Sequence, residues 1–283
     1  MKKLLWAAAC AALLFAGCGS SDSSNANNTT ADASGDDGVF TVGMECGYAP
    51  FNWQTTSKTD TAVDLGSGAG YCDGYDVVMS TKIADAMGQE VAVKKIAWDG
   101  LQPALESGEI DAIVAGMTAS PEREEGIDFT TPYYESQMVM IVPKDSKQAS
   151  FDDIQQFSGM NVIGQKNTNY DDIIDQIEGV NHLTPKANYP ELVLAINNGD
   201  ADGVTAELPV AEGVVAANPN LTYITFADGK GFDVDTSVSI GLKNNSKDSE
   251  FFKKVQEALD SISDKDRNQY MLDAVNNAPT SEE

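Results

Sequence analysis

Apolar residues beyond position 38 follow two alternating spacings. Short apolar runs predict buried β-strands at residues 39–44, 91–96 and 111–115. Between the first two runs, Met79, Ile83 and Met87 recur at every fourth position, which predicts an amphipathic helix over 76–87. A second helix is expected over 101–107, where a glycine follows. Strands that alternate with helices are typical of βα units, so the pattern predicts an α/β fold with mostly parallel strands.

A weak internal repeat indicates two similar halves. Residues 104–115 contain a helix end, a glycine, an aspartate and an apolar strand, and residues 195–206 contain the same features in the same order. We interpret the repeat as two lobes of similar α/β construction, although so short a match also arises by coincidence. In this alignment Gly116 and Glu207 follow equivalent strands. Ligands of open α/β sheets bind beyond the carboxyl ends of strands, so both positions are candidates for a site between the lobes.

The N-terminus has the pattern of an export signal. Two lysines precede a stretch of about a dozen apolar residues, which is too short to span a membrane. Small residues before Cys18 resemble the cleavage box of bacterial lipoproteins, except that Phe15 stands where an aliphatic residue is usual. We therefore predict a signal peptide over residues 1–17 and a lipid on Cys18; cleavage without lipid is the alternative. Residues 18–38 are rich in Ser, Asn, Asp and Thr and predict a flexible tether.

Such an N-terminus places the folded part outside the cytoplasm, anchored to the outer face of a membrane through Cys18. A disulfide is allowed in that compartment. Cys10 would leave with the signal peptide and Cys18 would carry the lipid. Cys46 and Cys72 then remain, either as a disulfide or as two buried thiols.

Composition narrows the class of function. The chain has 283 residues, 42% of them hydrophobic, which suffices for one large domain or two modest ones. Its formal net charge is −26 with no basic stripe, so nucleic-acid binding is not expected. The only histidine, His182, lies in a predicted loop. The sequence contains no plausible nucleophilic triad and no His/Cys metal cluster, so we expect no enzyme activity, metal or cofactor.

Arg123 is one of only two arginines, and it follows a predicted strand. Gly116, Thr118 and a turn at Pro121 come between the strand and the arginine. A planar guanidinium beside free backbone N–H groups can hold a small carboxylate through paired hydrogen bonds. The alternative is a surface arginine that pairs with a neighbouring glutamate. If Arg123 faced Glu207 across a cleft, the site would suit a zwitterion such as an α-amino acid.

Six short stretches, each weak alone, occur together in a characteristic order. They are residues 48–51 (YAPF), 74–79 (GYDVVM), 98–101 (WDGL), 108–118 (GEIDAIVAGMT), 121–133 (from PER to TTPY) and the pair 159–168 with 199–209. Together they resemble the family 3 solute-binding proteins of bacterial polar amino-acid ABC transporters. The resemblance covers the chain from about residue 39 to its C-terminus.

The resemblance implies a two-lobed periplasmic-binding-protein-like fold of type II, in which two mixed sheets are joined by two crossing strands. Lobe 1 would comprise residues 39–135 with 236–283, and lobe 2 residues 136–235. The crossings are expected near residues 134–138 and 234–239. The chain would end in a helix with an apolar face formed by Phe251, Phe252, Val255 and Leu259.

The resemblance also implies how an amino acid would be held at both ends. Arg123 and the segment from Gly116 to Thr118 would bind the carboxylate from lobe 1, and Thr168 would bind it from lobe 2. Glu207 stands where the family usually has an aspartate that binds the ammonium group.

Three further residues would surround the ligand side chain. Tyr48 and Tyr75 would be two aromatic walls, suited to stacking and to cation–π attraction. Glu45 matches a position where family members often place an acid. These residues favour a cationic or amide side chain, with arginine, lysine, glutamine and cystine all open.

The function implied is capture of a polar L-amino acid by lobe closure and its delivery, by a monomeric binding protein, to an ABC permease in the membrane. Two alternatives are a dehydratase built on the same fold and an amino-acid sensor domain. The anchor and tether favour capture over catalysis, and no membrane span or cytoplasmic module follows Glu283, which disfavours a receptor.

Overall fold

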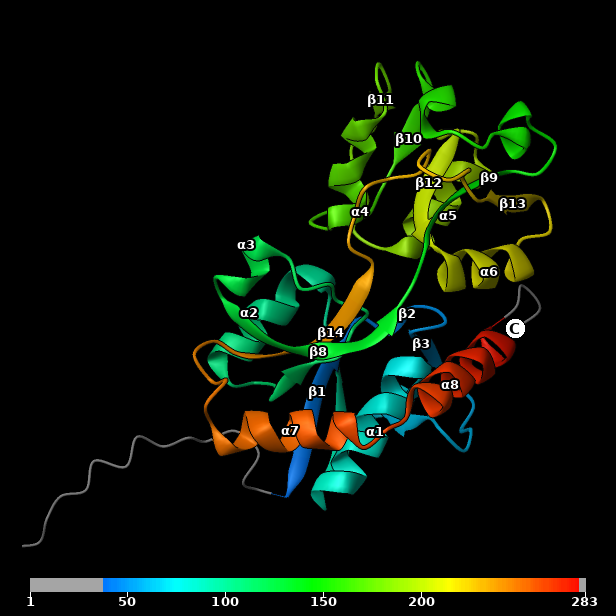
Figure 1. The fold of residues 1–283 in the computed structure, drawn as a ribbon. Helices are drawn as coiled ribbons and strands as arrows, with labels where there is room; N and C mark the ends of the chain where they lie inside the picture. The colour runs from blue at the N-terminus through cyan, green and yellow to red at the C-terminus, as the bar shows by residue number, and fades with distance from the viewer. Residues whose placement is uncertain (1–37, 280–283) are drawn as a thin grey trace, which may run out of the picture. The chain divides into compact units, whose positions relative to one another are not determined.

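Two five-stranded sheets form the framework of the computed structural model, which describes residues 38–279 (Figure 1). The predicted signal peptide, Cys18 and all of the predicted tether except Gly38 lie outside the described residues. Among the helices of residues 38–279, none combines the length and the apolar character that a membrane span requires.

The first sheet has the strand order β6-β1-β7-β14-β8. Its parallel strands are β1 (Val39–Met44), β6 (Glu90–Lys95) and β7 (Ala112–Ile113). The antiparallel strands β14 (Ser237–Lys243) and β8 (Ile127–Glu135) complete it. The predicted strand at 111–115 is shorter than expected, because the chain turns at Gly116, where φ is 60°.

Helices cover this sheet and account for the apolar spacing in the sequence. The predicted helix over 76–87 is α1 (Tyr75–Met87), and α2 (Leu101–Ser107) matches its prediction. Both helices end at a glycine in the left-handed conformation, Gly88 and Gly108, which only glycine adopts readily. The four-residue helix α3 (Pro121–Glu124) leads into β8.

Two helices follow β14. In α7 (Glu250–Asp260), Phe252, Val255 and Leu259 are buried as predicted, whereas Phe251 is half-buried. A final helix, α8 (Asp264–Asn277), was not expected from the sequence, because its few apolar residues lie among many charged ones. Figure 1 shows α7 and α8 on the same side of the first sheet as α1.

The second sheet has the order β11-β10-β12-β9-β13. Its strands are β9 (Met138–Pro143), β10 (Asn161–Ile163), β11 (Asn181–His182), β12 (Gly203–Glu207) and β13 (Leu221–Ile224). Its α-helices are α4 (Asn169–Asp172), α5 (Tyr189–Asn197) and α6 (Leu208–Ala217). The sheet is mixed, since β10 and β12 are parallel whereas β9 runs antiparallel to β12 and β13.

The chain passes between the two sheets twice. β8 belongs to the first sheet and β9 to the second, with residues 136–137 between them. The return runs from β13 of the second sheet to β14 of the first, through residues 225–236. The architecture is therefore a two-lobed type II fold.

A small third sheet of order β2-β3-β5-β4 lies at the edge of the first lobe. It consists of β2 (Gly47–Tyr48), β3 (Asn52–Thr55), β4 (Val63–Asp64) and β5 (Tyr71–Asp73). Cys46, just before β2, is bonded to Cys72 in β5. Of the two states left open by the sequence, the structure has the disulfide.

Candidate functional site

Residues of both lobes enclose a cavity of about 10 Å³. The predicted residues that line it are Glu45, Tyr48, Gly116, Thr118, Arg123 and Thr168. Trp98, Gln165 and Tyr170 complete much of the remaining wall. The space is smaller than any amino acid, so a ligand requires the lobes to separate before it enters. Beyond Arg123 the cavity gives way to an open groove of about 910 Å³.

Arg123 is held at the mouth of this cavity by contacts with both lobes. Its Nη1 donates to the Thr118 carbonyl at 2.8 Å, and its Nη2 donates to the Asn167 carbonyl at 3.2 Å. Its guanidinium carbon lies 5.2 Å from the centre of the Trp98 ring, a cation–π distance. The ion pairs of residues 38–279 do not include Arg123, so the alternative of a surface pair with a neighbouring glutamate is not what the structure has.

The backbone around Arg123 explains how it is aimed. Ser120 caps α3, and its side chain accepts a hydrogen bond from the Arg123 backbone N–H at 3.3 Å. Burial lowers the pKa of Arg123 from its ordinary value, although the group remains a cation. The second arginine, Arg267, lies near the start of α8 and does not line the cavity. It donates hydrogen bonds to the carbonyls of Leu259, Ile262 and Pro132.

Glu207 ends β12 in the second lobe and is completely buried. Its Oε1 accepts a hydrogen bond from the Tyr48 hydroxyl of the first lobe at 2.7 Å. Its Oε2 has no hydrogen-bond partner among the described residues. Burial raises the pKa of Glu207 to about 7, against the opposing effect of the Tyr48 and Tyr170 hydroxyls. Glu207 does not itself line the cavity; it lies directly behind Tyr48.

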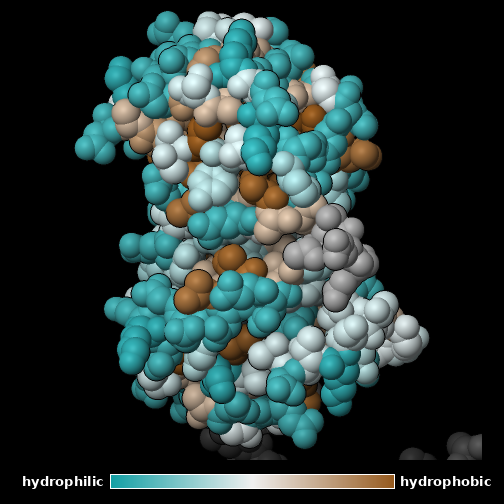
Figure 2. All heavy atoms as spheres, turned by 90° about the vertical axis from the view of Figure 1, so that its right-hand side faces the viewer, coloured by the Kyte–Doolittle hydropathy of each residue, from teal (hydrophilic) through white to brown (hydrophobic). Residues whose placement is uncertain are grey.

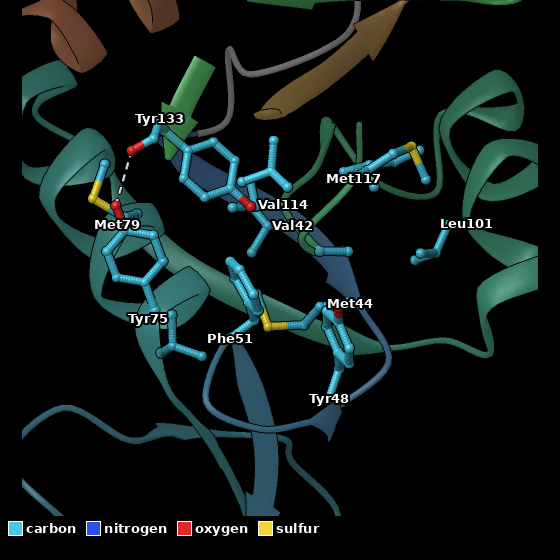
Figure 3. Close-up of a cluster of buried hydrophobic side chains, with 14 of the residues drawn as sticks. Val42, Met44, Tyr48, Phe51, Tyr75, Met79, Leu101, Val114, Met117 and Tyr133 are labelled. Atoms are coloured by element: carbon cyan, nitrogen blue, oxygen red, sulfur yellow. Dashed lines mark hydrogen bonds between the residues drawn. The ribbon is translucent and has the colours of Figure 1, made fainter. Parts of the chain in front are cut away.

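Of the two tyrosines predicted as aromatic walls, Tyr48 lines the cavity and Tyr75 does not. Tyr75 is fully buried, and its hydroxyl donates to the Tyr133 carbonyl at 2.9 Å. Phe51 lies between the two tyrosines, stacked on Tyr48 and edge-on to Tyr75 (Figure 3). Tyr75 is the first residue of α1, and this start points its ring into the core.

Trp98 is the aromatic residue that sequence reasoning missed as a wall. It begins the short 3₁₀ turn Trp98–Gly100, and its indole Nε1 donates to the Asn167 carbonyl of the other lobe at 3.0 Å. The sequence did contain a signal, since the WDGL stretch at 98–101 was among those carrying the resemblance. What the sequence lacked was the direction of the side chain.

Gly116 and Thr118 shape the wall beneath Tyr48. A Cβ added to Gly116 would lie 3.0 Å from the Tyr48 ring, so glycine permits the close approach of this ring. The Gly116 N–H donates to the Tyr133 hydroxyl at 3.0 Å, so this group is engaged within the lobe. The Thr118 hydroxyl lies 3.4 Å from the Tyr170 hydroxyl of the second lobe.

Glu45 of the first lobe and Gln165 of the second meet in the wall of the cavity. Gln165 Nε2 donates to Glu45 Oε2 at 3.1 Å and to the Ala187 carbonyl at the same distance. Burial raises the pKa of the Glu45 carboxyl, although the Gln165 hydrogen bond opposes this shift. A carboxylate and an amide from different lobes are thus hydrogen-bonded to each other in the cavity wall.

Thr168 organises the loop that the second lobe contributes. Its Oγ1 donates to the Gln165 carbonyl at 2.7 Å and accepts from Asp171 N at 3.3 Å, so it caps α4. Asn167, just before it, has φ of 59°, the left-handed conformation that asparagine tolerates. No group of three or more metal-ligating side chains is present within the described part of the chain.

Two α/β lobes, two crossings and a charged, aromatic cavity between the lobes define a two-lobed solute-binding protein. Residues 40–273 match the profile described as bacterial extracellular solute-binding proteins, family 3. The chain belongs to this family and is the substrate-binding component of an ABC importer.

Relatives of known name share about a quarter to a third of their residues with the chain. A probable histidine-binding protein of Campylobacter jejuni is 31% identical over 75% of this chain and 74% of its own length. The arginine-binding extracellular protein ArtP of Bacillus subtilis is 27% identical over 93% of this chain and 94% of its own.

A solved structure shows the same fold. An amino-acid ABC transporter substrate-binding protein of Streptococcus pneumoniae, bound to L-arginine, superposes with a TM-score of 0.72. It is 26% identical, and the match covers 85% of this chain and 95% of that one.

Proposed function

We propose that the protein captures an L-α-amino acid with a cationic side chain and delivers it to its permease. The observation that carries this proposal is that one lobe presents a guanidinium with unused N–H donors and the other contains a buried carboxyl group with an unpartnered oxygen. Arg123 of lobe 1 uses only two of its five N–H donors on nearby carbonyls, and Glu207 of lobe 2 has one unpartnered oxygen. These groups complement the carboxylate and the ammonium of a zwitterion.

The ligand carboxylate would replace the backbone carbonyls as the acceptor for Arg123. Carbonyl oxygens are weaker acceptors than a carboxylate, and a bidentate pair has better geometry. Separation of the lobes would break the contact between Glu207 and Tyr48 and expose the carboxyl group, and the ammonium would then donate to Glu207 Oε2, which has no hydrogen-bond partner among the described residues. A micromolar Kd corresponds to about −8 kcal/mol. Two charge-assisted contacts of about 1.5–3 kcal/mol each, together with stacking, approach that value once ordering costs are subtracted.

The preference for a cation comes from the far end of the cavity. Glu45 is an acid at the place where the ligand side chain would extend, and Tyr48 and Trp98 lie on the walls. Aromatic faces attract a guanidinium or ammonium. Relatives named for arginine and for histidine fit this reading. Glutamine is the nearest competitor, because Gln165 can exchange hydrogen bonds with an amide.

The remaining features of the protein are proposals on the same basis. We assign lobe 1 to residues 39–135 with 236–283 and lobe 2 to 136–235. The chain acts as a monomer, tethered through a lipid on Cys18 outside the cytoplasm, and it does not turn over its ligand. His182, the sole histidine, supports the last point, since Asp171 and Asp175 occupy both of its ring nitrogens away from the cavity.

Isothermal titration calorimetry with L-arginine, L-lysine, L-histidine, L-glutamine and L-cystine tests the proposal. We expect micromolar or tighter binding of at least one basic amino acid and a loss of at least about 100-fold in Arg123→Ala, because a buried charged contact disappears. Lys94→Ala is the control, as Lys94 lies in an exposed pair with Glu109. Binding of no amino acid, or wild-type affinity in Arg123→Ala, would overturn the proposal.

A further inference from the structure

Asp76 is a completely buried carboxylate that does not line the cavity. It is the second residue of α1. Its two side-chain hydrogen-bond partners are almost completely buried as well. Those partners are Asn52, at 1% exposure, and Tyr133, at 1%. A buried carboxylate is costly unless hydrogen bonds compensate for it, so this cluster calls for an explanation beyond packing.

One oxygen of Asp76 is connected, through the Tyr133 hydroxyl, to the Gly116–Thr118 segment of the cavity wall. The Tyr133 hydroxyl donates to Asp76 Oδ1 at 2.6 Å. Because the hydroxyl proton is committed to the carboxylate, the hydroxyl oxygen is free to accept, and it accepts the Gly116 N–H at 3.0 Å. Figure 3 shows the Tyr133 ring reaching from its strand toward this segment. Gly116 precedes Thr118, whose carbonyl holds Arg123.

The other oxygen of Asp76 is connected, through the Asn52 side chain, to the β2–β3 hairpin that contains Tyr48. Asn52 Nδ2 donates to Asp76 Oδ2 at 2.8 Å, and Asn52 Oδ1 accepts the Gly47 N–H at 3.4 Å. Asn52 is also paired with Tyr48 across β2 and β3. The Asp76 backbone N–H adds a bond to the Phe51 carbonyl at 2.7 Å. The hairpin is therefore fixed to the start of α1 by side chain and backbone together.

We propose that Asp76 is a positioning residue that sets the spacing between the Tyr48 hairpin and the Gly116–Thr118 segment. The two segments meet at Tyr48, whose ring lies against Gly116 with room only for a hydrogen there. A shift of either segment changes the approach of the Tyr48 ring, the reach of its hydroxyl to Glu207 and the position of Arg123. The proposal rests on the function proposed above, because the readout is amino-acid binding.

Substitutions can separate the two arms. Tyr133→Phe removes the hydroxyl that joins Asp76 Oδ1 to the Gly116 N–H and leaves the arm through Asn52 in place. Asn52→Ala removes the hairpin arm alone. Asp76→Asn places an amide against the Asn52 amide, so one arm is lost. The exchange Asn52→Asp with Asp76→Asn restores an amide–carboxylate pair, and the Tyr133 hydroxyl again finds an acceptor.

The test is calorimetric titration with L-arginine, with thermal unfolding measured in parallel. Tyr133→Phe and Asp76→Asn are each expected to weaken binding about tenfold or more, as the loss of a buried hydrogen bond to a charged group does. The Asn52→Asp/Asp76→Asn exchange should recover most of the lost affinity. Ser80→Ala is the control, because its buried hydroxyl bonds the Asp76 carbonyl at 2.6 Å in the same helix but belongs to neither arm.

Two outcomes would overturn the proposal. Wild-type affinity in Tyr133→Phe is one, and an equal loss in Ser80→Ala is the other, since it would reduce the effect to general destabilisation. Hydrogen exchange of the Gly116 amide separates this inference from the proposed function. Exchange of the Gly116 amide should be faster in Tyr133→Phe than in Ser80→Ala, whichever ligand the wild type binds. Unchanged exchange would contradict the proposed link from Asp76 to Gly116. A wild type that binds no amino acid contradicts only the function.

Discussion

Burial changes the acid chemistry of Glu207 at the second-lobe strand end. Its pKa is raised to about 7 by burial, so the fold favours the protonated form over the ionised one. A raised carboxyl pKa means that the folded chain binds this proton more tightly than the unfolded chain does. The stability contributed by protonated Glu207 is therefore present below its unfolded pKa and is lost as the pH rises toward 7.

Ligand binding should show the opposite pH dependence. An ammonium ion requires the ionised carboxylate, so affinity for a basic amino acid is expected to fall as the pH drops below 7, by up to about tenfold per pH unit. Near pH 6.5, binding should release protons from Glu207, which calorimetry in two buffers of different ionisation enthalpy detects.

Glu207→Gln should bind weakly with a flattened pH profile, whereas Glu212→Gln, on the neighbouring helix α6, should behave as wild type. Affinity that stays constant from pH 5.5 to 8 (about two and a half units) contradicts the assignment of the ammonium to Glu207.

The two aromatic residues Trp98 and Tyr75 should respond to substitution in opposite ways. Trp98→Ala removes a wall of the cavity and the hydrogen bond to Asn167, so we expect at least about a tenfold loss of affinity with little loss of stability. Tyr75→Phe leaves the buried Tyr133 carbonyl without its donor, so it should destabilise the fold by about 1–3 kcal/mol and change affinity much less. Titration and denaturant unfolding of both variants check this; a reversed pattern contradicts the assignment.

Sequence reasoning located charges at this site better than it located rings. Arg123 lines the cavity and Glu207 is hydrogen-bonded to Tyr48 in its wall; both were predicted because each follows a strand end, and strand ends are fixed by the apolar pattern. Tyr75 and Trp98 could not be sorted in the same way. Whether an aromatic side chain faces the core or a cavity depends on how its turn is oriented, which the spacing of apolar residues does not encode.

At the scale of elements, the Cys46–Cys72 bond joins the hairpin to the strand before α1. It closes a loop with a sequence separation of 26 residues. Cys46 directly follows Glu45 and has φ of 48°, a left-handed conformation that non-glycine residues adopt at a cost. We therefore expect the bond to hold Cys46 in place and to help direct Glu45 toward the cavity that it lines.

Replacement of both cysteines by serine should lower stability and weaken binding together. Closure of a loop of this length is worth about 3 kcal/mol in the chain-entropy account. We expect a loss of that order in denaturant unfolding and a lower affinity for L-arginine at temperatures where the variant is folded. A variant that loses stability but keeps wild-type affinity would show that the disulfide has no part in directing Glu45.

Element prediction succeeded where periodicity was strong and failed where it was not. The helix over 76–87 and the strand over 39–44 were predicted to within a residue, because their apolar spacing is regular. β4 and β5 are held by turns and by hydrogen bonds from Thr59 and Thr61 to Asp73, and such polar contacts leave no periodic trace. The helix α8 is also hard to predict, because most of its residues are polar or charged and its few apolar residues show no strong periodicity.

At the scale of the whole molecule, hydrophilic residues dominate the face seen in Figure 2, and hydrophobic residues appear there as separate patches. This surface agrees with the formal net charge of −26. Arg123, the one described cationic residue that lines the cavity, is half-buried within that acidic surface. An acidic exterior raises the local concentration of a cationic ligand at low ionic strength. The charge therefore favours the same ligand class as the cavity.

Closure of the lobes depends on contacts outside the cavity as well as within it. Asp99 of lobe 1 accepts hydrogen bonds from Lys166 Nζ at 2.9 Å and from Asn167 Nδ2 at 2.7 Å, both in lobe 2. Asp99 directly follows Trp98, so these two contacts connect the lobes at the rim of the cavity. Because Asp99 and Lys166 are about half exposed, the pair is worth little, on the order of 1 kcal/mol or less.

Because the contacts of Asp99 are weak, they should change the fraction of molecules with closed lobes only moderately. Asp99→Asn is expected to weaken L-arginine binding by about two- to fivefold, because a fraction of a kcal/mol is lost from the closed state alone. Small-angle scattering should show a larger radius of gyration for the variant at a subsaturating ligand concentration. The matched control is Lys94→Gln, since Lys94 pairs with Glu109 within lobe 1 at 3.5 Å and cannot report on closure.

The same comparison between wild type and Asp99→Asn can be repeated at different ionic strengths. Screening weakens an exposed ion pair, so the difference between wild type and Asp99→Asn should shrink as ionic strength rises from 0.01 M to about 1 M. The contribution of half-buried Arg123 should persist to a greater extent, because partly buried charges are screened less than exposed ones. A difference that survives high salt would mean that Asp99 acts through its hydrogen bond to Asn167, and hence through the backbone that also receives Trp98 and Arg123.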